Sequence, residues 1–133
     1  MSAQQHYDAQ AIEKKWQEYW EENQTYAVHN SVEGKENFYT LSEFSYPSGN
    51  LHVGHWYAFA LPDIYARYKR MLGYNVLYPT GFDAFGLPAE NAAIKRGADP
   101  KAWTWEHMEH MRTQLRTMGT SFDWSREVVT ADP

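Results

Sequence analysis

The segment from Tyr46 to His55 has the sequence features of a phosphate-binding site. His52 and His55 stand three positions apart, with Gly54 between them, and they follow a loop rich in Pro, Ser and Gly. On the first turn of a helix this spacing puts both imidazole rings on one face, where they could donate hydrogen bonds to phosphate oxygens. A helix N-terminus also offers unpaired N–H groups and partial positive charge, and a glycine lets a phosphate or a flat base approach the backbone. We therefore take His52, Gly54 and His55 as candidate anion-binding residues.

Two other interpretations of this histidine pair remain open on spacing alone. Histidines near a helix start are often structural or surface residues. A zinc site needs further ligands, and this pair lacks the glutamate and the four-residue spacing of a metalloprotease helix. We therefore predict no metal ligand here.

A second candidate residue, Asp83, lies in the loop and helix start between Gly81 and Glu90. Its carboxylate, flanked by aromatic residues, could pair with an ammonium group. An aspartate in this setting is as often a turn residue or a helix cap. A third segment, Phe122–Glu127, offers Asp, Ser and Arg but no nearby histidine, so it does not support a hydrolytic triad, and we expect it to pack and to form hydrogen bonds.

Two strands and the helix between them should position these segments. The residue pattern predicts a strand from Phe38 that ends near Phe44, and a buried strand over residues 75–78. An apolar stripe predicts the intervening helix, which Gly73 should end and Pro62 should kink; its members are Val53, Tyr57, Ala60, Ile64, Tyr68 and Leu72. Such a crossover makes the strands parallel and places both candidate segments at the carboxyl edge of the sheet, where α/β folds bind ligands.

Three further helices complete the predicted elements. Asp8 should cap a helix that ends near residues 21–23, and a second helix should cover residues 87–95 with Gly97 as its stop. Asp99 resembles an N-cap followed by proline, and another helix should begin at Thr104. The apolar stripe of that last helix reads as ordinary core: Met108, Met111, Leu115 and Met118, ending at Gly119. No repeat or linker divides the chain.

The composition favours one compact domain and excludes several classes of function. The chain has 133 residues, a net charge of −5 and no cysteine, so a disulfide scaffold, a thiolate metal site and a whole-chain electrostatic grip on nucleic acid are all disfavoured. With no signal-like N-terminus and no apolar run long enough for a membrane span, we expect a cytoplasmic protein without membrane contact. The aromatic content of 17% suggests packing against something beyond this chain.

The three segments, in this order, resemble the start of a class I aminoacyl-tRNA synthetase, specifically of the leucyl-tRNA synthetase family. His52-Val53-Gly54-His55 resembles the class I "HIGH" signature, and the preceding Tyr-Pro-Ser-Gly is typical of the leucine enzymes. Gly81–Glu90 and Asp123–Glu127 are similar to the other N-terminal signatures of that family. The resemblance covers essentially the whole chain and implies that residues 1–133 are the N-terminal part of a Rossmann-like α/β catalytic domain, ending before the editing insertion.

The resemblance also implies a reaction and roles for residues. ATP would activate leucine to leucyl-adenylate, and the leucyl group would pass to tRNA(Leu), with Mg²⁺ accompanying the ATP phosphates. Gly54 would lie beneath the adenine, and His52 and His55 near the phosphates. Asp83 would hold the leucine ammonium, and Tyr46 would shape the side-chain pocket. The backbone around Glu43 and Phe44 would contact the amino acid.

The sequence departs from the family pattern in three ways. Glu43-Phe44-Ser45 stands where an apolar residue and proline are common before the tyrosine, and Pro62 interrupts a helix that is usually continuous. The chain ends at Pro133, before the second half of the fold, the Lys-Met-Ser-Lys-Ser loop and the tRNA-binding domains. Because that loop supplies cations to the departing pyrophosphate, we expect little turnover by this chain without the remaining parts of the synthetase.

Two hypotheses from other classes remain open: a stand-alone nucleotide-binding module, and a non-catalytic fragment that associates through exposed aromatic side chains. Six basic residues on the predicted helices are expected to be solvated faces rather than a tRNA contact: Lys69, Arg70, Lys95, Arg96, Arg112 and Arg116.

Overall fold

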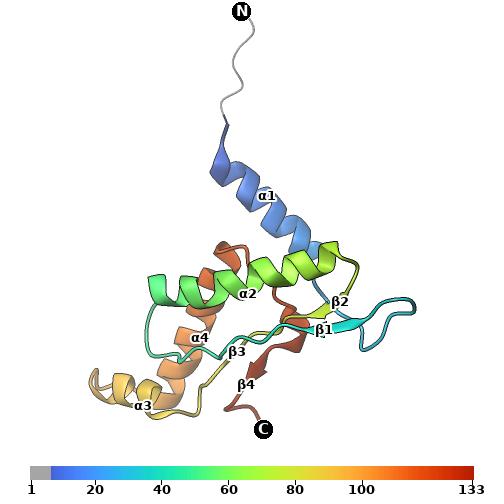
Figure 1. Ribbon diagram of the computed structural model, residues 1–133. Helices are drawn as coiled ribbons and strands as arrows, with labels where there is room; N and C mark the ends of the chain where they lie inside the picture. Colours follow the sequence, from blue (N-terminus) through green and yellow to red (C-terminus); the bar gives the residue numbers. More distant parts are fainter. Residues whose placement is uncertain (1–6) are drawn as a thin grey trace, which may run out of the picture.

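The computed structural model describes residues 7–133 and contains four helices, a short 3₁₀ helix and four short strands within that range (Figure 1). In chain order these are α1 (Ala9–Glu22), β1 (Asn37–Tyr39), α2 (Val53–Met71), β2 (Asn75–Leu77), β3 (Gly81–Phe82), α3 (Leu87–Ile94), α4 (Pro100–Thr117), the 3₁₀ helix η1 (Trp124–Arg126) and β4 (Val128–Val129). No helix among these residues combines the length and apolar character that crossing a bilayer requires.

The predicted parallel crossover is confirmed. β1 pairs with β2 in parallel, with Phe38 opposite Val76, and α2 connects the two strands. The first strand is shorter than expected, because β1 ends at Tyr39. One more ladder bond follows, from the Thr40 amide to the Leu77 carbonyl (2.9 Å), and the chain then leaves β2 and forms an isolated parallel bridge from Ser45 to Phe82.

A second parallel sheet, of β3 and β4, has no counterpart in the sequence analysis. Gly81 pairs with Val128 and Phe82 with Val129. A Cβ atom at Gly81 would lie 2.4 Å from the Val128 carbonyl oxygen, so only glycine allows this strand approach. With Ser45 on its other side, β3 joins the segment after β1 to the end of the chain.

Helix α2 is present as predicted, but the stripe that reveals it does not face the core. Its buried residues are Phe59 and Ala66. The stripe members Val53, Tyr57, Ile64, Tyr68 and Leu72 are all more than half exposed. A helix that is apolar on two sides has two candidate packing faces, and sequence periodicity alone cannot rank them. α2 runs unbroken through Pro62, and the predicted kink there stays a prediction.

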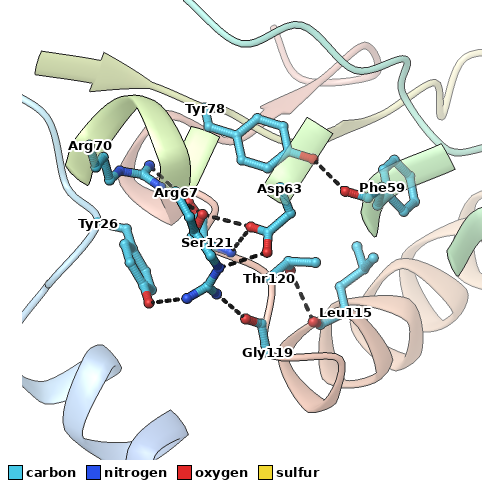
Figure 2. A network of polar contacts seen from close by, with 10 residues as sticks. All are labelled: Tyr26, Phe59, Asp63, Arg67, Arg70, Tyr78, Leu115, Gly119, Thr120 and Ser121. Carbon is cyan, nitrogen blue, oxygen red and sulfur yellow. Dashed lines mark hydrogen bonds and ion pairs between the residues drawn. The ribbon is translucent and has the colours of Figure 1, made fainter. Parts of the chain in front are cut away.

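A polar network fixes α2 against the segment that follows α4 (Figure 2). Asp63 accepts hydrogen bonds from the Ser121 amide and hydroxyl (both 2.6 Å) and from Arg67 Nε (2.8 Å). Arg67 also donates to the Tyr26 hydroxyl and to the Gly119 carbonyl. Burial disfavours the charge on Arg67, but the hydrogen bonds and charges of Asp63 and Tyr26 together outweigh it, so the pKa of Arg67 is raised. The network therefore holds α2 by directional bonds on its polar side.

The remaining helices confirm the capping predictions and correct one boundary. Asp8 caps α1 through a bond from the Ala11 amide (3.1 Å), but α1 has no buried residue and projects from the body of the molecule (Figure 1). Asp99 caps α4, which runs continuously from Pro100, so the expected new helix at Thr104 is wrong. Pro100 starts the helix because its fixed φ suits the first turn. The core side chains of α4 are Met108, Met111 and Leu115.

Candidate functional site

One cavity of about 490 Å³ brings together every site residue predicted from the sequence. It lies between the segment after β1, the first turns of α2, the loop after β3 and the residue after β4. Its lining residues are Glu43, Phe44, Ser45, Tyr46, His52, Gly54, His55, Ala58, Phe59, Asp83 and Thr130. Ser45, Ala58, Phe59 and Thr130 were not predicted. Ala58 and Phe59 follow His55 by three and four residues, so helical spacing could have indicated both. Ser45 and Thr130 carried no such signal.

The two histidines form a reciprocal cap on α2. His52 is the N-cap, and its Nδ1 accepts a hydrogen bond from the Gly54 amide (3.0 Å). His55 Nδ1 in turn accepts from the His52 amide (3.2 Å). The ring centroids are 4.1 Å apart. The expectation that both rings share one face is confirmed.

This cap fixes the tautomer of both neutral rings. Because each Nδ1 accepts a bond from a backbone N–H, the neutral ring carries its proton on Nε2. Each imidazole therefore keeps one N–H donor, at Nε2, for a group outside the cap. The Gly54 amide, by contrast, is already paired with His52 Nδ1, so it is not one of the unpaired N–H groups of this helix start.

Gly54 is required here for a local steric reason. A Cβ atom at this position would lie 2.8 Å from Cε1 and 3.0 Å from Nδ1 of His52. A side chain would therefore push the His52 ring out of its cap. The missing side chain therefore leaves room for the His52 ring as well as for any ligand that approaches the backbone.

His55 is tuned toward its neutral form. Burial lowers the pKa of His55, the charge of His52 lowers it further, and the opposing charge of Glu43 does not compensate. A neutral ring can keep its Nδ1 acceptor bond and its Nε2 donor at the same time. The electrostatics thus favour the state that the cap requires.

Asp83, on the wall of the same cavity, is held by backbone and side-chain bonds. Its amide donates to the Ser45 carbonyl (2.9 Å), and its Oδ1 accepts from the Thr130 hydroxyl (3.1 Å). The helix-cap interpretation of Asp83 is wrong, since the N-cap of α3 is Gly86 and has no side-chain cap bond. Asp83 is only partly buried. A partly buried carboxylate on a cavity wall is suited to an ammonium partner.

Ser45 gives the site a buried hydroxyl without a protein partner. The residue is 4% exposed, and its Oγ has no hydrogen-bond partner. It belongs to the Glu43–Ser45 departure from the family pattern. Buried hydroxyls are normally satisfied, so this Oγ is an unpaired polar group in a residue that lines the cavity.

The segment around Asp123 serves structure, as expected. Asp123 is 1% exposed and accepts bonds from the Val28 amide (2.9 Å) and from the amide and hydroxyl of Ser125. It joins the chain after α1 to η1. It does not line the cavity that holds the histidines.

Comparison with known proteins gives this cavity a family context. The family model of the class I tRNA synthetases (M) matches residues 38–127. The chain is 54% identical to the leucine–tRNA ligase of Fusobacterium nucleatum and 55% identical to that of Deinococcus radiodurans, in each case over 96% of this chain. It spans about 15% of the length of these relatives.

Solved structures agree with the sequence relatives. The agnB2 LeuRS of Agrobacterium radiobacter K84, in a ternary complex with tRNA and LeuAMS, matches with a TM-score of 0.90 and 38% identity over 96% of this chain and 16% of its own. The methionyl-tRNA synthetase of Mycobacterium tuberculosis, in complex with methionyl-adenylate, matches with a TM-score of 0.68 and 31% identity over 73% of this chain and 19% of its own. The Rossmann-like α/β fold class is therefore confirmed, and the chain belongs to the class I tRNA synthetases.

Proposed function

We propose that this chain supplies the ATP- and leucine-binding part of a leucine–tRNA ligase, which activates leucine to leucyl-adenylate and transfers it to tRNA(Leu). The observation that carries the proposal is the cavity in which the His52–His55 pair faces the same space as Asp83. Hydrogen-bond donors for phosphate and a carboxylate acceptor for an ammonium group line the same cavity. This combination suits a ligand that joins a nucleotide to an amino acid. The curated relatives, which share more than half of their residues with this chain over the matched segment, carry that enzyme name.

At the nucleotide end, the histidine pair acts through its two free Nε2 donors. These N–H groups would donate to phosphate oxygens of ATP, and Gly54 would let the adenine lie against the backbone. Leucine carboxylate attacks the α-phosphorus in line, the bond to pyrophosphate breaks, and pyrophosphate leaves with its bonding electrons. The contribution of the protein is to position the two reactants and to stabilise the charge that develops on the phosphate.

At the amino-acid end, Asp83 accepts the leucine ammonium. Tyr46 and Phe44 supply aromatic surface beside it, which suits a branched aliphatic side chain. Glu43 lines the same cavity, and we assign its backbone rather than its carboxylate to the amino acid.

Mg²⁺ fits this site only through the nucleotide. Within residues 7–133 no group of three or more His, Cys, Asp or Glu side chains is arranged to hold a metal ion. Mg²⁺ in nucleotide sites is commonly bound by phosphates and waters with one or two carboxylates. When bound with ATP, it would neutralise phosphate charge, while His52 and His55 orient the phosphates.

The 133-residue chain by itself should turn over slowly, because it covers only a small part of its relatives. We propose that catalysis, contact with tRNA(Leu) and a cytoplasmic location belong to the longer enzyme. A chimaera tests the proposal: the chain replaces the matching segment of the Fusobacterium nucleatum ligase. Leucine-dependent exchange of pyrophosphate into ATP is expected, together with its loss in His55→Ala. Wild-type exchange by His55→Ala would refute the role of the histidine.

A binding experiment separates this proposal from a stand-alone nucleotide-binding module. Calorimetric titration of the 133-residue chain with ATP and with leucine should show that both ligands bind. Asp83→Ala should weaken the binding of leucine and leave the binding of ATP unchanged. ATP binding without any leucine binding would favour the nucleotide module. A folded chain that binds neither ligand would favour a purely associating fragment.

A further inference from the structure

We propose that Thr130 is a positioning residue for Asp83, so that its hydroxyl sets the orientation in which the carboxylate receives the ammonium group of the substrate. This inference rests on the proposed function of Asp83 and adds a residue to it. Thr130 lies beyond residues 38–127, where the family model matches, and the sequence analysis gave it no role.

The geometry is a directed chain of two hydrogen bonds. The Phe85 amide donates to Thr130 Oγ1 (3.0 Å), and Thr130 Oγ1 lies 3.1 Å from Asp83 Oδ1. An N–H can only donate, so the hydroxyl accepts from Phe85 and its own proton points to Asp83. The chain therefore runs from the backbone of the loop, through Thr130, to one defined carboxylate oxygen.

The backbone of Thr130 is also held by a hydrogen bond. Thr130 follows β4 directly, and its amide donates to the Phe82 carbonyl (3.1 Å). Asp83 follows β3, and its amide donates to the Ser45 carbonyl (2.9 Å). The β3–β4 pairing thus brings two residues that are far apart in sequence to the same end of one small sheet, side by side.

This arrangement leaves part of the carboxylate for the ligand. A carboxylate has two oxygens and about four lone-pair positions. Thr130 uses one position on Oδ1, and no donor among residues 7–133 forms a hydrogen bond with Oδ2. A carboxylate whose torsion is fixed before binding loses less conformational freedom when an ammonium arrives. Loss of the Thr130 hydroxyl should therefore weaken ammonium binding without removing the charge that attracts it.

The experiment uses the 133-residue chain with three variants: Thr130→Val, which keeps the shape and loses the hydroxyl, Thr130→Ser, which keeps the hydroxyl, and Asp83→Asn. Leucine and ATP affinities are measured by calorimetry, and exchange of the Phe85 amide with solvent is measured by NMR. We expect Thr130→Val to weaken leucine binding about 2- to 10-fold and to leave ATP affinity unchanged. It should also speed exchange of the Phe85 amide with solvent. Thr130→Ser should match the wild type in all three measurements.

A double-mutant cycle distinguishes positioning from a general structural role. In the Asp83→Asn background, Thr130→Val should cause no further loss of leucine affinity, because its effect acts through the carboxylate. Equal loss in the Val and Ser variants, or additive loss in the cycle, would overturn the inference. If Thr130→Val binds leucine as tightly as the wild type, the role of Thr130 is overturned while the proposed function stands. If the wild-type chain does not bind leucine at all, both the role of Thr130 and the proposed function are overturned.

Discussion

The imidazoles of His52 and His55 hold the first turn of α2 together by a reciprocal pair of hydrogen bonds, with ring centroids 4.1 Å apart. Each Nδ1 must be unprotonated to accept its bond. A capping box normally uses a hydroxyl and a carboxylate or amide. Here the box is made of two imidazole rings, and the pKa of His55 is lowered, so the helix start responds to pH through His55.

Acid should therefore destabilise the chain through His55. Its pKa in the folded protein lies below the model-compound value of 6.5, chiefly because of burial, so the unfolded chain takes up the proton first as the pH falls. The free energy of unfolding should decrease as the pH drops below about 6.5 and level off below the folded pKa. Urea unfolding at a series of pH values measures this.

His55→Gln is the matched control for that titration. Glutamine can accept the His52 amide bond at the same position of the capping box but does not titrate. The pH dependence below about 6.5, the ordinary pKa of histidine, should become shallower. An identical pH profile in wild type and variant would exclude His55 as the group responsible.

Gly54→Ala should impair nucleotide binding more than stability. The new Cβ would meet the His52 ring at 2.8 Å and displace it, which loses a cap bond of about 1 kcal/mol. Alanine at a helical position is more stable than glycine by about 1 kcal/mol, so the two effects on the free energy of unfolding nearly cancel. Loss of the His52 donor should still lower ATP affinity roughly 3- to 10-fold.

Gly49→Ala provides the control for this substitution. Gly49 lies in the loop before α2, and a Cβ atom there meets nothing within 4 Å. ATP titrations of the two variants should differ, with Gly49→Ala close to wild type. If both variants bind ATP equally well, the His52 ring does not contact the nucleotide.

Asp63 should be the most costly polar residue of α2 to remove. Its side chain is 13% exposed and pairs with Arg67, whose side chain is 34% exposed, and it also accepts two bonds from Ser121. Asp63→Ala leaves the guanidinium and the Ser121 amide without this acceptor. Because Arg67 retains some solvent contact, the loss should be about 2 kcal/mol rather than the 3–5 of a fully buried pair.

A surface ion pair in the same protein gives the comparison. Lys14 and Glu18 lie 3.8 Å apart with side chains 78% and 61% exposed. Chemical denaturation should show Lys14→Ala to be indistinguishable from wild type, since exposed pairs of this kind contribute little. A similar midpoint shift for both variants would show that the Figure 2 network adds nothing beyond a surface pair.

Local signals allowed the sequence to predict helix starts, helix ends and the sheet edge that carries the site. Asp8 and Asp99 form their cap bonds as expected, and Gly73, Gly97 and Gly119 all adopt the positive φ of helix stops. Such features depend on a few neighbouring residues. The parallel crossover brings the segments after β1 and β2 to one edge. The Ser45–Phe82 bridge then brings Asp83, which follows β3, to the cavity that the histidines line.

Long-range pairing is where prediction failed. β3 and β4 have two residues each, and the whole of α3, α4 and η1 separates the partners Gly81 and Val128 in the sequence. Two residues carry no readable periodicity. Since this pairing alone brings Thr130 to Asp83, sequence reasoning could place the carboxylate in the site but could not identify the hydroxyl that holds it.

The exposed face of α2 should make the isolated 133-residue chain self-associate. Tyr57, Ile64 and Tyr68 lie on one apolar stripe and are 65%, 63% and 52% exposed. A contiguous apolar stripe of this kind normally marks an interaction surface. Sedimentation velocity at increasing concentration should show a shift to larger species for the wild type. Ile64→Lys should reduce this shift, whereas Ile94→Lys, at a 60% exposed position on α3 outside the stripe, should not. A compact monomer at every concentration would show that α2 tolerates solvent on this face.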